Sequence, residues 1–292
     1  MAGSRVALRL HETCRMLVSR LEQASARNVD ALAVDDGYPS TAARIEGLLA
    51  ASQLVGGVSP AVRSELAKRA RLTTLRAGEL LWRQGDLATH MHVIGRGLVT
   101  IRRTSEAGSA SIVAIFGARE SVGDTAALES ARYPAEAIVI STEATVVRLD
   151  ATVVAARART CAALAEALQG SLLRHNAALR VKVDILSAGS VRARLGHLFL
   201  HLVSRFGDEL ADGSIYLPVA LTRVAIADLV AARVETVVRA LRPWERDGTL
   251  VTSPDGFVIG DLAGLSAVVA GSDGNGRRPI AEALRRRGHV TS

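Results

Sequence analysis

The segment from Leu221 to Leu241 constrains the fold of this 292-residue chain more than any other. Apolar residues recur at helical spacing in two short runs, Val224, Ala227 and Val230, then Val234, Val237, Val238 and Leu241. Only the small residues Ala231 and Ala232 separate the runs. Helices this short are not stable alone and must pack against each other and a third helix. The sequence therefore predicts a helix-turn-helix.

A β-hairpin is predicted directly after these two helices. Asp247 and Gly248 end the second helix, and the β-prone runs 250–252 and 257–259 flank the turn sequence Ser253-Pro254-Asp255-Gly256. A helix-turn-helix followed by a hairpin is a winged helix. Pro243 lies inside the predicted second helix, where it removes a backbone donor and clashes with the preceding turn. We therefore expect a kink or an early end at Pro243.

The start of the second helix carries side chains suited to reading DNA. Glu235 and Arg239 stand four residues apart on one face, where a carboxylate can accept from cytosine and an arginine can donate bidentately to guanine. Thr236 and the first helix amides suit a phosphate. The alternative is an ordinary surface ion pair, which contributes about 0.2–0.5 kcal/mol to a helix.

The run Val234-Glu235-Thr236-Val237-Val238-Arg239, followed by Asp247-Gly248-Thr249-Leu250 and a wing, resembles the recognition region of the Crp/Fnr family of bacterial transcription regulators. Glu235, Thr236 and Arg239 match the family pattern. Alanine stands where the family has a turn glycine, and Arg233 stands where it has a capping hydroxyl, a loss that costs about 1 kcal/mol. The resemblance extends over residues 54–262.

The resemblance implies how the second helix and the residues around it would contact DNA. Glu235 and Arg239 would read bases, and Val238 would touch a thymine methyl group. Thr222, Arg223, Arg233 and Thr236 would hold phosphates. The complete expected DNA-binding set is Thr222, Arg223, Arg233, Val234, Glu235, Thr236, Val238 and Arg239.

The resemblance also implies an α+β architecture with a β jelly roll like that of cyclic-nucleotide-binding domains, a long dimerisation helix and a C-terminal winged helix-turn-helix. Turn signals every 8–12 residues or so independently indicate a β-barrel or sandwich. The expected parts are an N-terminal helical extension (1–50), the barrel sensor (51–152), the dimerisation helix (153–187), the DNA-binding domain (188–264) and a flexible basic tail (265–292).

The expected effector pocket departs from that of cyclic-AMP-binding members. In those members a glutamate after a glycine holds the ribose, and an Arg-Ser pair grips the phosphate. Here Asp124 follows Gly123, while Pro134 and Ala135 occupy the Arg-Ser positions and provide no charge-assisted grip. Arg132 would substitute only in a rearranged loop. The expected pocket residues are Gly123, Asp124, Thr125, Ala126, Arg132, Tyr133 and Arg180.

The effector is left open between a cyclic nucleotide, haem and an unidentified ligand. Haem requires an axial ligand, for which the candidates are His11, His90, His92 and His175, although a lone histidine is more often structural. Cys14 and Cys161 are too few for a four-cysteine iron–sulfur cluster or a disulfide framework. No metal site is expected.

Residues 153–187 carry an apolar stripe close to heptad spacing, formed by Leu164, Leu168, Leu172, Leu179, Val183 and Leu186. We interpret this stripe as a homodimer contact, because a two-fold protein matches a pseudo-palindromic operator. The alternative is a long amphipathic helix packed on its own barrel.

These features predict a sequence-specific, DNA-binding transcription regulator controlled by a signal in the barrel. Its partners would be double-stranded DNA, a second copy and, for an activator, RNA polymerase. A net charge of +7 favours a polyanionic partner. The alternative is a ligand-binding module acting through protein contacts. No nucleophile–base pair, Walker loop or metal triad indicates an enzyme, and no run of about 18 apolar residues indicates a membrane span. Charges near the N-terminus argue against secretion, so we expect a cytoplasmic location.

Overall fold

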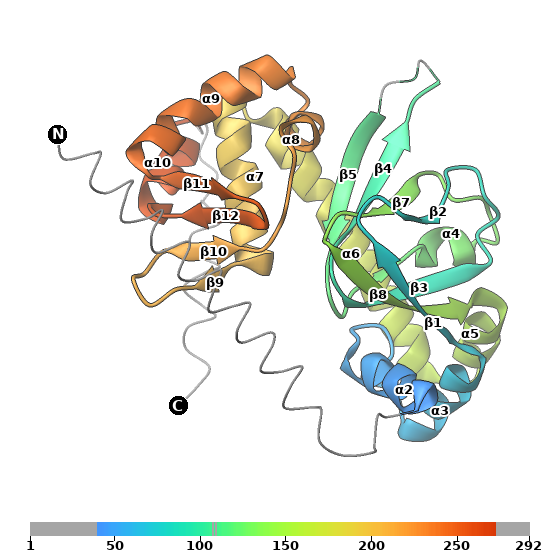
Figure 1. Ribbon diagram of the computed structural model, residues 1–292. Helices are drawn as coiled ribbons and strands as arrows, with labels where there is room; N and C mark the ends of the chain where they lie inside the picture. Colours follow the sequence, from blue (N-terminus) through green and yellow to red (C-terminus); the bar gives the residue numbers. More distant parts are fainter. Residues whose placement is uncertain (1–39, 107, 109, 273–292) are drawn as a thin grey trace. The chain divides into compact units, whose positions relative to one another are not determined.

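The computed structural model describes residues 40–106, 108 and 110–272, which fall into two compact units (Figure 1). The barrel unit consists of residues 40–187 together with 221–231. The winged-helix unit consists of residues 188–220 together with 232–272. The segment 221–231 thus groups with the barrel, although the sequence assigns it to the domain 188–264. Most of the expected N-terminal extension and the tail beyond residue 272 lie outside the described residues.

Two four-stranded antiparallel sheets form the core of the barrel unit, with strand orders β1-β8-β3-β6 and β2-β7-β4-β5. The strands are β1 (Arg71–Arg76), β2 (Leu80–Trp82), β3 (His90–Arg96), β4 (Val99–Thr104), β5 (Ala110–Phe116), β6 (Ser121–Val122), β7 (Glu136–Val139) and β8 (Glu143–Asp150). A tight turn separates β3 from β4. A Cβ atom at Gly97 in that turn would lie 2.3 Å from the Glu143 carbonyl oxygen, so only glycine fits.

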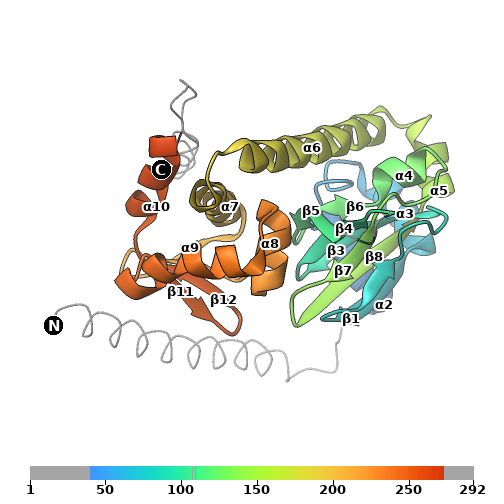
Figure 2. The same ribbon diagram turned by 90° about the horizontal axis from the view of Figure 1, so that it is seen from above.

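Helices pack around these sheets, and the longest of them, α6, runs alongside the strands (Figure 2). The barrel unit contains α2 (Thr41–Ala51), α3 (Pro60–Arg69), α4 (Asp124–Leu128), α5 (Ala151–Ala158), α6 (Ala162–Ser187) and α8 (Arg223–Val230). Helix α3 begins with Ser59 as N-cap and Pro60 in the first turn. Ile45 and Leu49 of α2 are buried in the barrel core, so residues 41–50 pack with the barrel and do not extend from it.

The region expected to form one dimerisation helix is two helices. Asp150 caps α5 by accepting hydrogen bonds from the backbone nitrogens of Thr152 (2.8 Å) and Val153 (3.2 Å), and α6 begins only at Ala162. Leu164 and Leu168, expected in the dimer stripe, are instead buried in the barrel core, with 0% and 6% exposure. The first turns of α6 pack on α4 and α5, and these two leucines fill that contact.

Helix α8 is held against the barrel by Lys182 of α6 and by packing on β5. The Lys182 ammonium donates hydrogen bonds to the carbonyl oxygens of Asp228 (3.1 Å) and Leu229 (2.6 Å). These carbonyls lie at the C-terminus of α8, where no further helix amide can bond to them and where a cation is favoured. Burial lowers the pKa of Lys182 to about 8, and the nearby Asp228 partly offsets that decrease.

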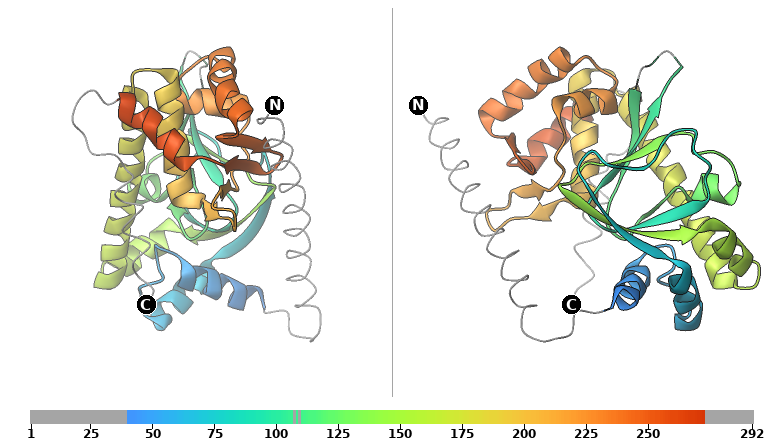
Figure 3. Two further views of the ribbon diagram at one scale, coloured as in Figure 1. Left: turned by 90° about the vertical axis from the view of Figure 1, so that its left-hand side faces the viewer. Right: turned by 45° about the vertical axis from the view of Figure 1, so that its right-hand side comes forward.

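The winged-helix unit is built from α7 (Val191–Phe206), β9 (Asp208–Glu209), β10 (Ile215–Leu217), α9 (Val234–Asp247), β11 (Leu250–Ser253), β12 (Gly256–Ile259) and α10 (Leu262–Ser272) (Figure 3). Its sheet has the order β11-β12-β10-β9. Phe199 of α7 meets Phe257 of β12 edge to face, with ring centroids 5.2 Å apart, and Trp244 of α9 is 1% exposed. The hairpin predicted from the turn sequence is therefore present and packs on the helices.

Helix α10 corrects the prediction of a flexible tail from residue 265. Leu265 and Val269 are buried, and α10 packs along α7. The close contact depends on Gly196 of α7, where a Cβ atom would lie 2.8 Å from the Val269 side chain. The segment has no charged residue between Leu262 and Ser272. Packing on α7 therefore removes from water apolar surface that a solvated tail would leave exposed, which stabilises the fold.

Among the described residues, no helix is both long and apolar enough to cross a bilayer.

A buried histidine makes the barrel sensitive to acid. His92 of β3 is 5% exposed and packs beside Trp82, with ring centroids 4.9 Å apart. Burial, with the charges of Arg148 and His90 as smaller causes, lowers the pKa of His92 to about 3. The unfolded chain binds this proton at a pKa near 6.5. The neutral form thus contributes stability that is complete above about pH 6.5 and declines as the pH falls toward 3.

We predict that wild-type protein loses about 1 kcal/mol more stability between pH 7.5 and 5.5 than the His92→Leu variant, because leucine binds no proton in either state. Denaturant unfolding of both proteins, followed at the two pH values, measures the difference. An equal loss in wild type and variant would show that His92 does not titrate on unfolding in this range.

Candidate ligand cavity and nucleic-acid interface

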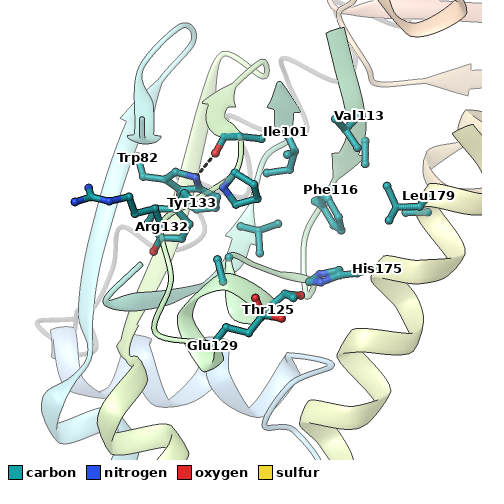
Figure 4. A pocket seen from close by; sticks show the side chains of 17 residues that line it. Trp82, Ile101, Val113, Phe116, Thr125, Glu129, Arg132, Tyr133, His175 and Leu179 are labelled. Atoms are coloured by element: carbon teal, nitrogen blue, oxygen red, sulfur yellow. Dashed lines mark hydrogen bonds between the residues drawn. The ribbon is translucent and has the colours of Figure 1, made fainter. Parts of the chain in front are cut away.

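The barrel unit contains a cavity of about 320 Å³, within the size range of small-molecule sites (Figure 4). Strands β2, β4 and β5, helix α4, the loop before β7 and helix α6 all contribute to its wall. Buried apolar and aromatic residues form its interior, while Thr125, Glu129, Arg132 and Pro134 are exposed at its rim. Its lining residues from α6 are His175, Ala178 and Leu179.

A pair of stacked aromatic rings forms one wall of the cavity. Trp82 and Tyr133 lie with ring centroids 4.3 Å apart and planes 20° apart. The Trp82 indole nitrogen donates to the Ala135 carbonyl oxygen (2.8 Å), and the Tyr133 hydroxyl donates to the His90 carbonyl oxygen. Both polar groups are therefore satisfied outside the cavity, and the rings present apolar surface to its interior. Burial raises the pKa of Tyr133.

Asp124, the first residue of α4, is fully buried and is absent from the cavity wall. Its Oδ2 accepts hydrogen bonds from the Ser121 hydroxyl (2.9 Å) and from the Ser171 hydroxyl of α6. Its Oδ1 lies 3.5 Å from Nδ1 of His175, also on α6, and has no hydrogen-bond partner. Since His175 Nε2 faces the Ser121 carbonyl oxygen at 2.9 Å, it must be the donor there. One proton between His175 Nδ1 and Asp124 Oδ1 would satisfy both atoms.

The loop at the expected phosphate position offers no grip for an anion. Pro134 has no backbone donor, and neither Pro134 nor Ala135 has a side-chain donor. The Arg132 guanidinium donates to the Gly85 carbonyl oxygen (2.8 Å) and extends away from the other labelled side chains (Figure 4). Glu129 adds a carboxylate at the rim.

The structure brings most of the expected pocket residues together but separates two of them. Gly123, Thr125, Ala126, Arg132 and Tyr133 line the cavity. Asp124 faces α6, as described, and Arg180 is exposed on α6 without lining the cavity. Sequence reasoning missed Trp82 and Phe116. Aromatic residues make up only 3% of the chain, so these rare side chains on β-strands were an available signal.

The candidate haem ligands are dispersed. His175 lines the cavity, but both of its ring nitrogens face Ser121 and Asp124. His92 is buried, and the half-buried His90 at the start of β3 lies beside Arg148, with 3.1 Å between ring and guanidinium nitrogens. His11 lies outside the described residues. The described part of the chain holds no group of three or more His, Cys, Asp or Glu side chains positioned for a metal ion.

Helix α9 buries one face and exposes a charged one. Val237, Leu241 and Trp244 are buried, while the opposite face exposes Glu235, Arg239, Arg242 and Arg246. Among the described residues, no ion pair joins Glu235 to Arg239, so the expected alternative of a simple surface ion pair is not formed. Arg233 is exposed, and Val234, Thr236 and Val238 are half-buried.

The ends of α8 and α9 show how the chain forms this turn with unusual residues. Thr222 caps α8 by accepting from the Ala225 nitrogen (3.1 Å), and Arg223 follows as its first residue. Ala231 ends α8 in the left-handed conformation at φ 48°, where glycine would be less strained. Arg233 provides no side-chain cap for α9, as expected.

Of the two expected effects of Pro243, an early end of the helix is wrong, because α9 continues through Pro243 to Asp247; the expected kink stays a prediction. Burial of Trp244, one residue later, offsets the lost hydrogen bond.

Comparisons with known proteins agree with this geometry. The model of the cyclic nucleotide-binding domain matches residues 72–160, and that of the Crp-like helix-turn-helix domain matches residues 193–268. Together they cover more than half of the chain. No curated protein sequence matches it. The chain belongs to the Crp/Fnr family of transcription regulators, and its predicted α+β fold is confirmed.

Solved structures of other regulators share this fold. FixK2 from Bradyrhizobium japonicum is 20% identical, with a TM-score of 0.59, over 71% of this chain and 99% of its own. A CRP-family transcriptional regulator from Thermus thermophilus is 25% identical, with a TM-score of 0.58, over 68% of this chain and 96% of its own. The c-di-GMP-responsive global regulator CLP from Xanthomonas campestris is 17% identical, with a TM-score of 0.56, over 69% of this chain and 99% of its own.

We predict that Gly123→Ala destabilises the barrel more than Gly78→Ala. Both glycines have positive φ angles, 80° and 85°, so each substitution costs about 1–2 kcal/mol of backbone strain. Only at Gly123 does a Cβ atom also approach the aromatic wall, 3.0 Å from Tyr133 and 3.2 Å from Trp82, whereas nothing lies within 4 Å at Gly78. Denaturant unfolding compares the variants. Equal destabilisation would mean that the Trp82 and Tyr133 rings move aside without a measurable cost in stability.

Proposed function

We propose that this chain is a homodimeric, sequence-specific DNA-binding transcription regulator whose affinity for DNA is controlled by a small molecule in the barrel cavity. The observation that carries the proposal is the exposed row Glu235, Arg239, Arg242 and Arg246 on α9, within a Crp-like helix-turn-helix domain. A cytoplasmic location, and contact with RNA polymerase when transcription is activated, accompany this function.

The positions along the row suggest a division of roles. Glu235 and Arg239 lie in the first two turns of α9, the part of a recognition helix that contacts base edges. Arg242 and Arg246 lie farther along, where a cation suits phosphate oxygens. The half-buried Val238 stands beside Arg239 and is placed for a thymine methyl group. A docking platform for proteins would not need this row of one carboxylate followed by bidentate donors.

Dimerisation is supported by an apolar stripe on α6. Seven large apolar side chains are exposed among the described residues, and five of them lie on this helix. Leu172, Leu179, Val183 and Leu186, with Asn176 among them, follow the alternating four- and three-residue spacing of a coiled-coil seam. Exposed apolar surface of this kind marks an interaction site, and a single polar residue in a seam fixes its register.

Helix α6 also supports a coupling between ligand binding in the cavity and the arrangement of the two subunits. Leu179 lines the cavity and also belongs to the exposed stripe, while His175 joins the cavity wall to buried Asp124. A molecule in the cavity would touch α6 directly. It would shift the population of α6 arrangements by binding one of them better.

We predict that Arg239→Ala weakens binding to an operator selected from random duplexes by about 1–3 kcal/mol while non-specific binding largely survives. The loss of a bidentate base contact is the reason, and a competition titration with operator and scrambled duplex measures it. Arg246→Ala is the matched control on the same exposed row and should weaken both duplexes similarly. An unchanged operator preference in Arg239→Ala would contradict base reading by this residue.

We predict that Val183→Asp shifts the protein from dimer to monomer, because it places a carboxylate in the apolar stripe. Val183 is 60% exposed and does not line the cavity, so the barrel should tolerate the change. Sedimentation equilibrium measures the shift. Ala177→Asp adds the same charge at an exposed position outside the stripe and should stay dimeric. A dimeric Val183→Asp protein would place the subunit contact elsewhere.

A further inference from the structure

We infer that the barrel cavity binds a flat, largely apolar molecule without a phosphate group, and not a cyclic nucleotide. The inference rests on the proposed function, in which this cavity is the effector site, and it specifies the chemical class of the effector. Three observations carry it: the cavity lacks an anion grip, the Asp124 carboxylate beside Gly123 is already engaged, and the interior is aromatic.

Binding a phosphate requires donors that the cavity does not present. The loop 132–135 contributes a proline without an N–H and a guanidinium that donates to the Gly85 carbonyl oxygen. The rim carboxylate of Glu129 would repel an anion. Moving an anion from water into an apolar cavity without donors costs several kcal/mol. The other polar lining side chains are Thr125 at the rim and His175, whose ring nitrogens face Ser121 and Asp124, and the rest of the interior is apolar.

A ribose would meet the same difficulty. Asp124 is the carboxylate nearest in sequence to the cavity glycine, but it does not line the cavity, and its oxygens face Ser121, Ser171 and His175. Turning it into the cavity would remove the acceptor that the two serine hydroxyls share; the hydroxyls lie 3.0 Å apart, so one could donate to the other and one donor would be left unpaired. An unsatisfied buried donor costs about 1–3 kcal/mol.

The interior instead suits an aromatic or alicyclic body. Trp82 and Tyr133 present stacked ring surface, and Ile101, Val113 and Phe116 supply the facing apolar side chains from β4 and β5. Apolar contact with such a wall drives binding in proportion to the area buried. Polar atoms occur only toward the rim, so the ligand's polar substituents would lie there.

The test uses the full chain and N-phenyl-1-naphthylamine, an uncharged planar dye that fluoresces in apolar surroundings. We expect saturable binding of one dye per chain, with energy transfer from Trp82, and no displacement by millimolar cyclic AMP. Ala178→Phe fills the cavity from α6 and should weaken dye binding by at least about tenfold. Ala177→Phe, the same change at the neighbouring exposed position, should leave it within about twofold.

Val113→Phe fills the cavity from β5 and provides a second blocked variant if Ala178→Phe does not fold, as judged by circular dichroism. Displacement of the dye by cyclic AMP, or dye binding that neither blocked variant weakens, would overturn the inference. These outcomes are independent of DNA binding, which the same preparations report by titration with the selected operator. A protein that binds DNA but not the dye would retain the proposed function and lose the proposed ligand class.

Discussion

A carboxylate buried away from water must be surrounded by donors, and this requirement organises the sensor around Asp124. Its partners come from elsewhere in the chain, Ser121 on β6 and Ser171 and His175 on α6. The short helix α4 is thereby fixed to the long helix α6, with the cavity between α4, the strands and α6. The Ser121, Ser171 and Asp124 side chains form one buried hydrogen-bond network, so these elements keep a common geometry.

The engagement of Asp124 has a chemical consequence for the cavity beside it. A carboxylate committed to α6 cannot also hold a polar ligand, and the loop 132–135 does not replace it. The stacked Trp82 and Tyr133 then define the surface that a ligand meets. The link between the cavity and α6 and the apolar surface of the cavity both depend on the orientation of this one side chain.

Much of the fold was predictable from local sequence, and much of the cavity was not. Helix α9, the second helix of the helix-turn-helix, follows from apolar periodicity, and its hairpin follows from the turn at Pro254-Asp255. Both signals come from residues close together in the sequence. The burial of Leu164 and Leu168, the inward turn of Asp124 and the helix α10 depend on partners distant in sequence. Alignment of Gly123-Asp124 with the family pattern places Asp124 beside the cavity, but it does not say which way the carboxylate points. Similarly, heptad spacing does not say which leucines face the chain's own barrel.

The central claim is that this chain reads DNA as a two-fold regulator through α9, and sequence selection from a random duplex library tests it most directly. The account predicts enrichment of a pseudo-palindrome whose half-sites lie one helical turn apart, about 10 base pairs centre to centre. Enrichment should depend on the apolar molecule bound in the cavity. Recovery of sequences with no symmetry and no common half-site, with and without ligand, would contradict the account.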